Sequence, residues 1–318
     1  MDKTFLIVNS AREVVSKKTE HHHCLVEVLV PKKGFNRIIK SSMKILVTYG
    51  STSAKQGVFV FAFLLLVNCN IFAQANSQPF PWPDGKQCAV SLTFDDARAS
   101  QVNGGTALLD AYGVKATFYV VPSAVKGQLE GWKKAVASGH EIGNHSLNHP
   151  CSGNFVWSRS KALEEYTLEK MGAELIEANK QIKEMLGIDC KVFAYPCGQT
   201  FVGRGEGTQS YVPIVAKMFD NSRGWMDESA NDPSYVDFAQ LTGVESDGKD
   251  FDKILSLIEQ AKRSGQWLVL AGHEMGEGGD QTTRLKMLEE LMKYAANPAN
   301  GIWLAPVGTV ANYVAAKR

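Results

Sequence analysis

The chain has 318 residues, of which 44% are hydrophobic and 21% are charged, with 34 Lys and Arg against 33 Asp and Glu. This composition is that of an ordinary globular protein and excludes both a disordered chain and a fibrous repeat. The length suffices for one large domain or two small ones.

The first 75 residues differ from the rest and predict an export signal. An apolar run over residues 58–67 follows Lys44 and Lys55 and is followed by Ala73-Gln74-Ala75. A charged region, an apolar core and a small-x-small site in this order are typical of a signal peptide. The apolar run is also shorter than the ~20 residues that a membrane-crossing helix needs. We therefore expect cleavage after Ala75 and an exported protein, periplasmic or extracellular, with no stable membrane insertion after cleavage.

A long segment precedes this signal, although signal peptides normally begin close to the initiator. Residues 1–42 carry no clear periodicity, and we interpret their His21-His22-His23 run as solvated rather than as a metal site. We expect residues 1–42 to be an upstream extension outside the fold, residues 43–75 to be the signal peptide, and residues 76–318 to form one mature domain. A transmembrane anchor and a lipoprotein attached through Cys69 are the alternatives.

The mature region is mildly acidic. Residues 76–318 hold 24 Lys and Arg against 29 Asp and Glu, a net charge of −5, so the region lacks the basic surface expected of a nucleic-acid-binding protein. Four cysteines remain in it, without the paired Cys-x-x-Cys spacing of a zinc site: Cys88, Cys151, Cys190 and Cys197. Export permits a disulfide without indicating which cysteines it joins, and free thiols are the alternative.

From Ala89 onward, short β-branched or aromatic runs alternate with amphipathic stretches, which predicts repeated β-α units. In chain order we expect strand 89–94, helix 106–112, strand 116–121, helix 129–137, strand 141–144, helix 159–186, strand 191–195, helix 212–218, strand 239–244, helix 251–263, strand 267–271, helix 283–296, strand 302–305 and helix 307–316. The fold class is therefore α/β. About seven parallel strands with interleaved helices favour a distorted (β/α) barrel over an open sheet.

Two neighbouring carboxylates, Asp95 and Asp96, follow directly after the first expected strand. Paired carboxylates repel each other, which raises the proton affinity of at least one unless a cation or hydrogen bonds separate their roles. A helix N-cap could explain one of them but hardly both. We interpret the pair as part of a functional site.

The mature region has only four histidines. His145 and His149 are four residues apart, so on one helical turn both would project from the same face with Cβ atoms ~5–6 Å apart and could chelate a divalent cation. A helix surface that happens to carry two histidines is the alternative. His140 lies at the start of its expected strand, which gives it a structural role.

His273 follows the expected strand 267–271, and it therefore lies at the same kind of position as Asp95-Asp96, His145 and the segment 194–198. In a β/α barrel the carboxyl ends of the strands converge on one face, where catalytic groups collect. Four strand ends that carry reactive or turn-forming residues predict one active site.

Four ordered motifs carry a specific resemblance: Thr93-Phe94-Asp95-Asp96-Ala97, Gly139-His140-Glu141-Ile142-Gly143-Asn144-His145-Ser146-x-x-His149, Phe193-Ala194-Tyr195-Pro196-x-Gly198 and Leu270-x-x-His273. They resemble the motifs of polysaccharide deacetylases, also called the NodB-homology family, over roughly residues 82–313. The resemblance implies that residues 76–318 are a catalytic domain with a divalent metal, usually zinc, held by Asp96, His145 and His149. Two imidazoles and one carboxylate leave coordination positions open for a substrate oxygen.

The resemblance also implies the catalytic groups. Asp95 would be the general base, and His273 would be the general acid that protonates the departing amine or alcohol. The main-chain N–H of Cys197 would help to hold the tetrahedral oxyanion.

Two departures from the family pattern affect this site. Many members have an arginine, which orients the catalytic aspartate, where this chain has Ala194, and a tyrosine where it has Cys197. Asp220 or Arg223 are candidates to replace the missing polar support.

The predicted function is thus a metal-dependent hydrolase that removes acetyl groups from an N-acetylated or O-acetylated polysaccharide. The alternatives are hydrolysis of a smaller amide or formamide on the same fold, and a non-catalytic carbohydrate-binding protein. Trp132, Trp157 and Trp225 are candidates to stack on sugar faces, because aromatic rings offer apolar area to pyranose C–H groups.

Overall fold

The computed structural model describes residues 8–15, 21–31, 40–50 and 80–318, and the chain divides into two units, Met1–Gln78 and Pro79–Arg318. In the first unit, β1 (Val8–Val15), β2 (His21–Pro31) and β3 (Lys40–Gly50) form an antiparallel sheet. The expected start at Met43 falls within β3. The expected apolar core at 58–67 and the cleavage site lie outside the described residues, so the division at residues 42 and 75 stays a prediction.

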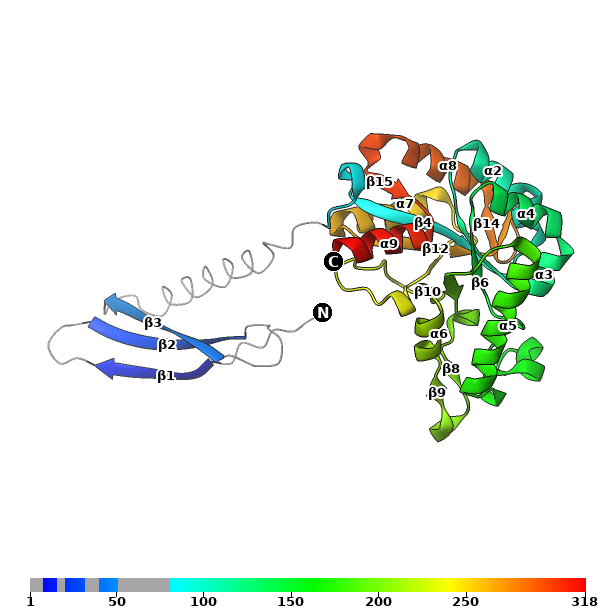
Figure 1. Cartoon of the computed structure of the whole chain (residues 1–318). Coiled ribbons are helices and arrows are strands. Elements are labelled where there is room, and N and C mark those ends of the chain that lie inside the picture. The colour runs from blue at the N-terminus through cyan, green and yellow to red at the C-terminus, as the bar shows by residue number, and fades with distance from the viewer. Residues whose placement is uncertain (1–7, 16–20, 32–39, 51–79) are drawn as a thin grey trace. The chain divides into compact units, whose positions relative to one another are not determined.

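A curled parallel sheet forms the centre of the second unit (Figure 1). Its order is β10-β7-β6-β5-β4-β12-β11, and β15 also pairs with β4. The strands are β4 (Cys88–Phe94), β5 (Thr117–Val120), β6 (Glu141–Asn144), β7 (Val192–Ala194), β10 (Asn221–Arg223), β11 (Val244–Glu245), β12 (Trp267–Gly272) and β15 (Ile302–Leu304). One parallel bridge, between Arg223 and Leu241 just before β11, joins the two ends of this order. The expected distorted barrel is confirmed, with eight strands in its sheet.

Helices connect the strands and lie around the sheet (Figure 1). They are α2 (Thr106–Ala111), α3 (Pro122–Gly127), α4 (Leu129–Ala137), α5 (Leu168–Leu186), α6 (Val212–Met218), α7 (Phe251–Ser264), α8 (Leu285–Ala296) and α9 (Val307–Lys317). All seven residues of β4 are buried, as expected of a parallel strand that helices cover. The burial leaves the carboxyl ends of the strands as the place where polar groups gather.

The long helix α5 shows how local sequence sets an element. The Thr167 side chain accepts a hydrogen bond from the N–H of Lys170 and caps the first turn, and Gly187 ends the helix with a φ of 74°, which favours glycine. Leu175 lies on the buried face of the helix, and its truncation to alanine would cost about 2–5 kcal/mol of stability. The expected helix 159–186 is therefore too long, because residues before this cap form short 3-10 turns instead.

Two other expectations about strands need correction. Strand β10 was not expected, because its sequence Asn221-Ser222-Arg223 has no apolar signal, yet all three residues are buried. The expected strand 239–244 begins in a 3-10 turn over Phe238–Gln240, and regular pairing starts only at Val244. Both differences fall where the sheet ends meet, so long-range pairing rather than local pattern decides the structure there.

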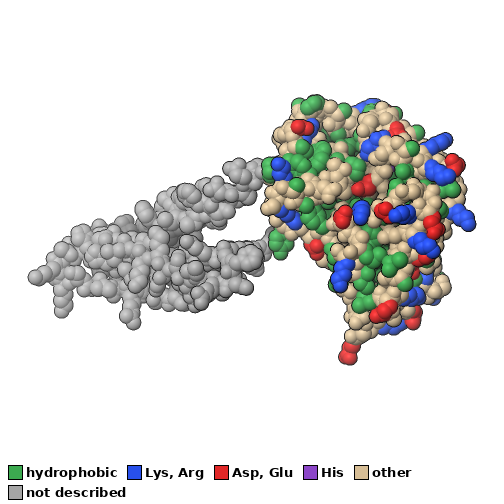
Figure 2. Space-filling view, in the orientation of Figure 1, with side chains coloured by type: hydrophobic (Ala, Val, Ile, Leu, Met, Phe, Trp, Pro, Cys, Tyr) green, Lys and Arg blue, Asp and Glu red, His purple; other side chains and the backbone are tan. Residues whose placement is uncertain are grey.

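The remaining strands form two small sheets, β8 (Phe201–Val202) with β9 (Gln209–Ser210) and β13 (Glu274–Gly276) with β14 (Thr282–Arg284). On the visible face of the second unit, Lys and Arg side chains are interspersed with Asp and Glu (Figure 2). Within the described parts of the chain, no helix combines the length and the apolar character needed to cross a membrane.

Candidate active site

The three expected metal ligands come together in a cleft of about 920 Å³ at the carboxyl ends of β4 and β6. Asp96 Oδ1 lies 3.6 Å from Nε2 of His145 and 3.3 Å from Nε2 of His149. One ligand atom from each of the three residues lies within 4.8 Å of the others. Two imidazole nitrogens and a carboxylate oxygen at this spacing suit a single divalent metal.

The two histidines do not lie on a helix, and that expectation was wrong. They belong to the loop after β6, where His149 has a φ of 51° and Ser146 a φ of 64°. Asn144 Oδ1 accepts from the N–H of Ser146 at 2.6 Å, and Ser146 Oγ accepts from the N–H of His149 at 2.9 Å. These local hydrogen bonds turn the loop so that the two rings approach to 4.7 Å between centroids.

The histidines are also prepared to bind a cation. Nδ1 of His145 lies 2.8 Å from the carbonyl oxygen of Ala194. Because a carbonyl oxygen can only accept a hydrogen bond, the proton resides on Nδ1, and the lone pair of Nε2 is free to bind a metal. Burial, together with the neighbouring imidazole of His145, lowers the pKa of His149 to about 4. His149 is therefore neutral at physiological pH.

Arg98, which the sequence did not single out, supports the third ligand. Its Nε and Nη2 donate to Oδ2 of Asp96 at 3.1 and 2.8 Å, so Oδ1 alone faces the histidines. Burial opposes ionisation of Asp96, but electrostatic interactions with His145, His149, His273 and Arg98 outweigh it and lower the pKa of Asp96 to about 2. The carboxylate is thus ionised over the whole physiological range.

Asp95 is buried, with 3% of its surface exposed, beneath the same cleft. The guanidinium of Arg223, which is 0% exposed, donates through Nη2 to Asp95 Oδ1. Arg223 of β10 pairs in register with Ala194 of β7. The positive charge absent at Ala194 is therefore supplied by Arg223, from the same level of the neighbouring strand. Asp220, the other candidate for this support, is exposed.

His273 follows β12 and is paired with an aspartate that the sequence did not reveal. Its Nδ1 lies 2.8 Å from Asp247 Oδ2, and Asp247 Oδ1 accepts from Thr283 Oγ1 at 2.7 Å. Burial disfavours the charged imidazole, but the hydrogen bond to Asp247 and the charges of Asp95 and Asp96 outweigh it and raise the pKa of His273. His273 therefore keeps its proton to higher pH than an ordinary histidine.

Gln101 connects the two sides of this part of the site. Its buried Nε2 donates to the carbonyl oxygens of Asp95 at 2.7 Å and of His273 at 2.8 Å. One side chain thereby fixes the backbone of both residues.

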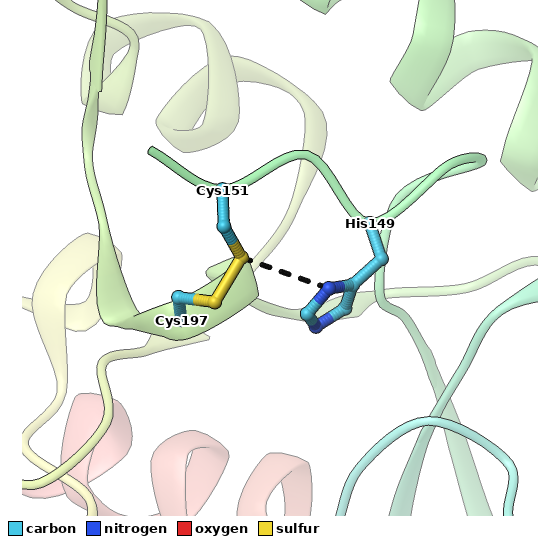
Figure 3. A group of neighbouring side chains, drawn as sticks. All are labelled: His149, Cys151 and Cys197. Atoms are coloured by element: carbon cyan, nitrogen blue, oxygen red, sulfur yellow. Dashed lines mark hydrogen bonds between the residues drawn. A yellow bond between two sulfur atoms is a disulfide. The ribbon is translucent and has the colours of Figure 1, made fainter. Parts of the chain in front are cut away.

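The structure resolves the pairing of the cysteines that the sequence left open. A disulfide joins Cys151 to Cys197 (Figure 3). Cys88 and Cys190 are buried free thiols. Cys197 lines the cleft in the 3-10 turn after β7 with a φ of 54°.

The three candidate tryptophans differ in their exposure and in their position relative to the cleft. Trp132 is 0% exposed in the core, so it cannot stack on a sugar. Trp157 is 55% exposed and lines the cleft, with its ring 5.9 Å from that of His149. Trp225 also lines the cleft and packs edge-on against His273 at 4.6 Å between ring centroids.

His140 lies at the opposite end of β6 from the cleft residues. Its Nδ1 accepts from the N–H of Ala116 at 3.2 Å, and its Nε2 lies 3.3 Å from Asp110 Oδ1. These contacts give it the structural role expected of it.

Residues 83–203 match the family model described as polysaccharide deacetylase. Over this segment the chain is similar to the polysaccharide deacetylase family. The matched segment contains the paired aspartates, both loop histidines and the two disulfide cysteines.

Similar proteins carry the family likeness over short segments. The chain is 34% identical over 91 residues to the uncharacterised protein YlxY of Bacillus subtilis, covering 29% of this chain and 25% of that protein. It is 40% identical over 62 residues to the peptidoglycan-N-acetylglucosamine deacetylase PgdA of Listeria monocytogenes, covering 19% of this chain and 13% of that protein. The chain thus spans a quarter or less of the length of these two relatives.

A solved structure extends the likeness to the whole second unit. The crystal structure assigned to a polysaccharide deacetylase from Mycobacterium smegmatis superposes with a TM-score of 0.54 at 16% identity, over 76% of this chain and 95% of that one. At this identity the likeness shows the fold alone.

Proposed function

We propose that residues 76–318 form a metal-dependent deacetylase that removes acetyl groups from an N-acetylated or O-acetylated glycan, with zinc as the expected metal. One observation carries the proposal. A cluster of three ligand atoms lies in the same cleft as a carboxylate paired with a buried arginine and a histidine paired with a buried aspartate. The match of residues 83–203 to the polysaccharide deacetylase model and the deacetylases among the relatives support it.

The donor set fits a zinc-like ion. Asp96, His145 and His149 offer one oxygen and two nitrogens, and the other polar atom of Asp96 and of His145 is already hydrogen-bonded within the protein, as is usual for metal ligands. A divalent metal held there would polarise the acetyl carbonyl and assist attack by water.

Asp95 is placed to act as the general base. Arg223 engages its Oδ1, while its Oδ2 lies 3.9 Å from Nε2 of His145, on the side of the ligand cluster. This oxygen takes the proton of the attacking water. The buried guanidinium fixes the carboxylate and stabilises its charge.

His273 is placed to act as the general acid. Its Nδ1 is held by Asp247, so Nε2 is the nitrogen that gives a proton to the leaving amine or alcohol. The raised pKa keeps that proton to higher pH than in an ordinary histidine. The main-chain N–H of Cys197, at the cleft wall, is proposed to donate to the oxyanion of the tetrahedral intermediate.

Acetate release from a panel of acetylated glycans, with and without added zinc, tests the function. The panel includes N-acetylated oligosaccharides, O-acetylated xylan fragments and a small formamide. Zinc-dependent acetate release from a glycan supports the proposal, and release of formate alone would assign the smaller-amide alternative. No hydrolysis at any metal concentration would favour a non-catalytic binding protein.

His273→Ala separates acid catalysis from metal binding. An amine leaves only when protonated, whereas an activated aryl acetate needs no proton for its leaving group. N-deacetylation should therefore fall by about a hundredfold or more while aryl acetate hydrolysis falls far less. Equal losses on both substrates would assign His273 to the fold or the metal site.

We further propose that the protein is exported and that its mature form begins near Asn76. The division of the chain between Gln78 and Pro79 into two units supports a boundary in this region. Sequencing the amino terminus of secreted protein tests the proposal, and retention of residues 1–42 would contradict it. An acetylated glycan is the expected partner, and nucleic acid is not.

A further inference from the structure

The disulfide joins two loops of the proposed active site (Figure 3). Cys151 follows His149 by two residues in the loop after β6, and Cys197 lies in the turn after β7. Cys151 is 0% exposed, whereas Cys197 lines the cleft. A reductant can therefore reach the bond from the cleft.

The imidazole of His149 lies between two groups of potential ligands. Its Nε2 is 3.3 Å from Asp96 Oδ1, and its Nδ1 is 3.7 Å from Cys151 Sγ. Ligand atoms of His149, Cys151 and Cys197 lie within 4.8 Å of one another, the same closeness as in the group of Asp96, His145 and His149. The two groups thus share one residue.

We propose that reduction of this disulfide creates a second metal site, formed by Sγ of Cys151, Sγ of Cys197 and Nδ1 of His149, for a thiophilic divalent cation such as Zn²⁺ or Cd²⁺. The inference rests on the proposed function in one respect, that His149 is also a ligand of the catalytic metal. Two thiolates and an imidazole are a favourable donor set for both cations.

The redox step balances with a dithiol as the reductant. The dithiol supplies two electrons and two protons, so the S–S bond breaks, two S–H groups form, and the dithiol becomes a disulfide. Binding of the cation then displaces the two thiol protons into solvent. While the disulfide is intact, neither sulfur can form a thiolate, and only the first metal site exists.

Hydrogen bonds independent of the disulfide keep the two cysteines close after reduction. Ser158 Oγ accepts from the N–H of Cys151 at 2.9 Å and donates to its carbonyl oxygen at 2.8 Å. The turn around Cys197 is held by the N–H of Gly198, which donates to the Tyr195 carbonyl oxygen at 2.8 Å. The two loops are joined by the N–H of Ser152, which donates to Gln199 Oε1 at 2.8 Å. The thiols therefore stay in reach of Nδ1 of His149.

The second site competes with the first. Thiolates bind zinc-like ions more strongly than carboxylates do, so a cation held by the two sulfurs draws His149 towards them and away from Asp96. The disulfide thereby protects the catalytic site, and reduced protein loses activity when thiophilic cations are present.

Cobalt substitution in the full-length chain tests this inference, because a thiolate bound to Co²⁺ gives a charge-transfer absorption in the near ultraviolet that carboxylate and imidazole do not. The oxidised chain should bind one Co²⁺ without this absorption. The chain that has been reduced with a dithiol, after removal of the dithiol, should show the thiolate absorption when Co²⁺ is added. A reduced chain that binds Co²⁺ without thiolate absorption would overturn the proposal.

The variant C151S/C197S is the matched control, because it lacks the disulfide but keeps the other four cysteines of the chain, Cys24, Cys69, Cys88 and Cys190. It should show no thiolate absorption. Added Cd²⁺ should inhibit the reduced wild type at least tenfold more than this variant, each relative to its own activity without Cd²⁺. Equal inhibition of the two proteins would mean that loss of the disulfide, and not binding of Cd²⁺ by the two thiolates, causes the inhibition. That result contradicts the proposal. If the oxidised chain binds no Co²⁺, the proposed function fails while the thiolate test still stands.

Discussion

The two sides of the cleft are built in different ways. On the metal side, His145 and His149 come from one loop, and that loop is held by hydrogen bonds to Asn144 and Ser146 within the same motif. The turn that places the two histidines is thus set by nearby residues, and the carbonyl oxygen of Ala194, which fixes the ring of His145, is added from the neighbouring strand.

On the proton-transfer side, the support comes from distant parts of the chain. Asp95 is paired with Arg223, 128 residues away, and His273 with Asp247, 26 residues away. The conformation of the loop that carries the two histidines therefore depends mainly on nearby residues. The charges of the proposed base and acid depend instead on partners from distant parts of the chain. The four predictions below test this division.

His145→Ala should have the largest effect, because it removes a ligand. The variant should lose bound zinc, measured by elemental analysis, and turnover should fall about a thousandfold or more, since metal stabilisation is worth several kcal/mol. Asp95→Asn should instead keep the metal and lose about a hundredfold or more in turnover. His140→Gln, at the other end of β6, is the control and should keep the metal. Loss of metal in Asp95→Asn would show that the two sides are not separate.

Arg223→Met should lower turnover by about a hundredfold and leave zinc content unchanged, because it leaves the buried Asp95 carboxylate unpaired. Since Arg223 pairs in register with Ala194, the double variant A194R/R223A should recover part of the loss. The readout is turnover at neutral pH together with zinc content. If A194R/R223A is no better than Arg223→Ala, the arginine acts through the fold and not through the charge of Asp95.

Asp247→Asn should move the alkaline limb of turnover to lower pH. The charge of Asp247 helps to raise the pKa of His273, and activity is lost as pH rises through that pKa, because only the protonated imidazole is an acid. Removing the charge lowers the pKa, so the loss begins earlier, and turnover at neutral pH should fall by roughly tenfold or more. An alkaline limb that does not move would mean that another group donates the proton.

Trp157→Ala should have the smallest effect. The exposed ring beside His149 offers a stacking surface worth about 0.5–1.5 kcal/mol, so KM for a glycan should rise roughly three- to tenfold while kcat is retained. Trp132→Phe, in the core, should change stability rather than KM. A loss confined to kcat would place Trp157 in the support of His149 instead of in substrate binding.

Much of the site could be predicted from local sequence. The strand β4 and the helices α4 and α6 have the residues expected of them, because apolar periodicity over a few residues decides what such segments bury. The proximity of Asp96, His145 and His149 follows from strand ends that meet at one face of a parallel sheet.

The conformation of the histidine loop could not be predicted in this way. The spacing of His145 and His149 suits a helical turn, yet the side chains of Asn144 and Ser146 form hydrogen bonds with the loop backbone instead. Such side-chain to backbone bonds compete with helix formation, and which one prevails depends on the strand that precedes the loop.

By itself, the sequence determined the periodic strands and helices of the barrel and the order of the chemical groups at the strand ends, because both depend on residues close together in the chain. Only the tertiary structure decided that Arg223 neutralises Asp95, that Asp247 holds His273, and which cysteines form a disulfide. These pairs join buried groups across strands, and the free energy of burying a charge depends on a partner that folding alone brings within hydrogen-bonding distance.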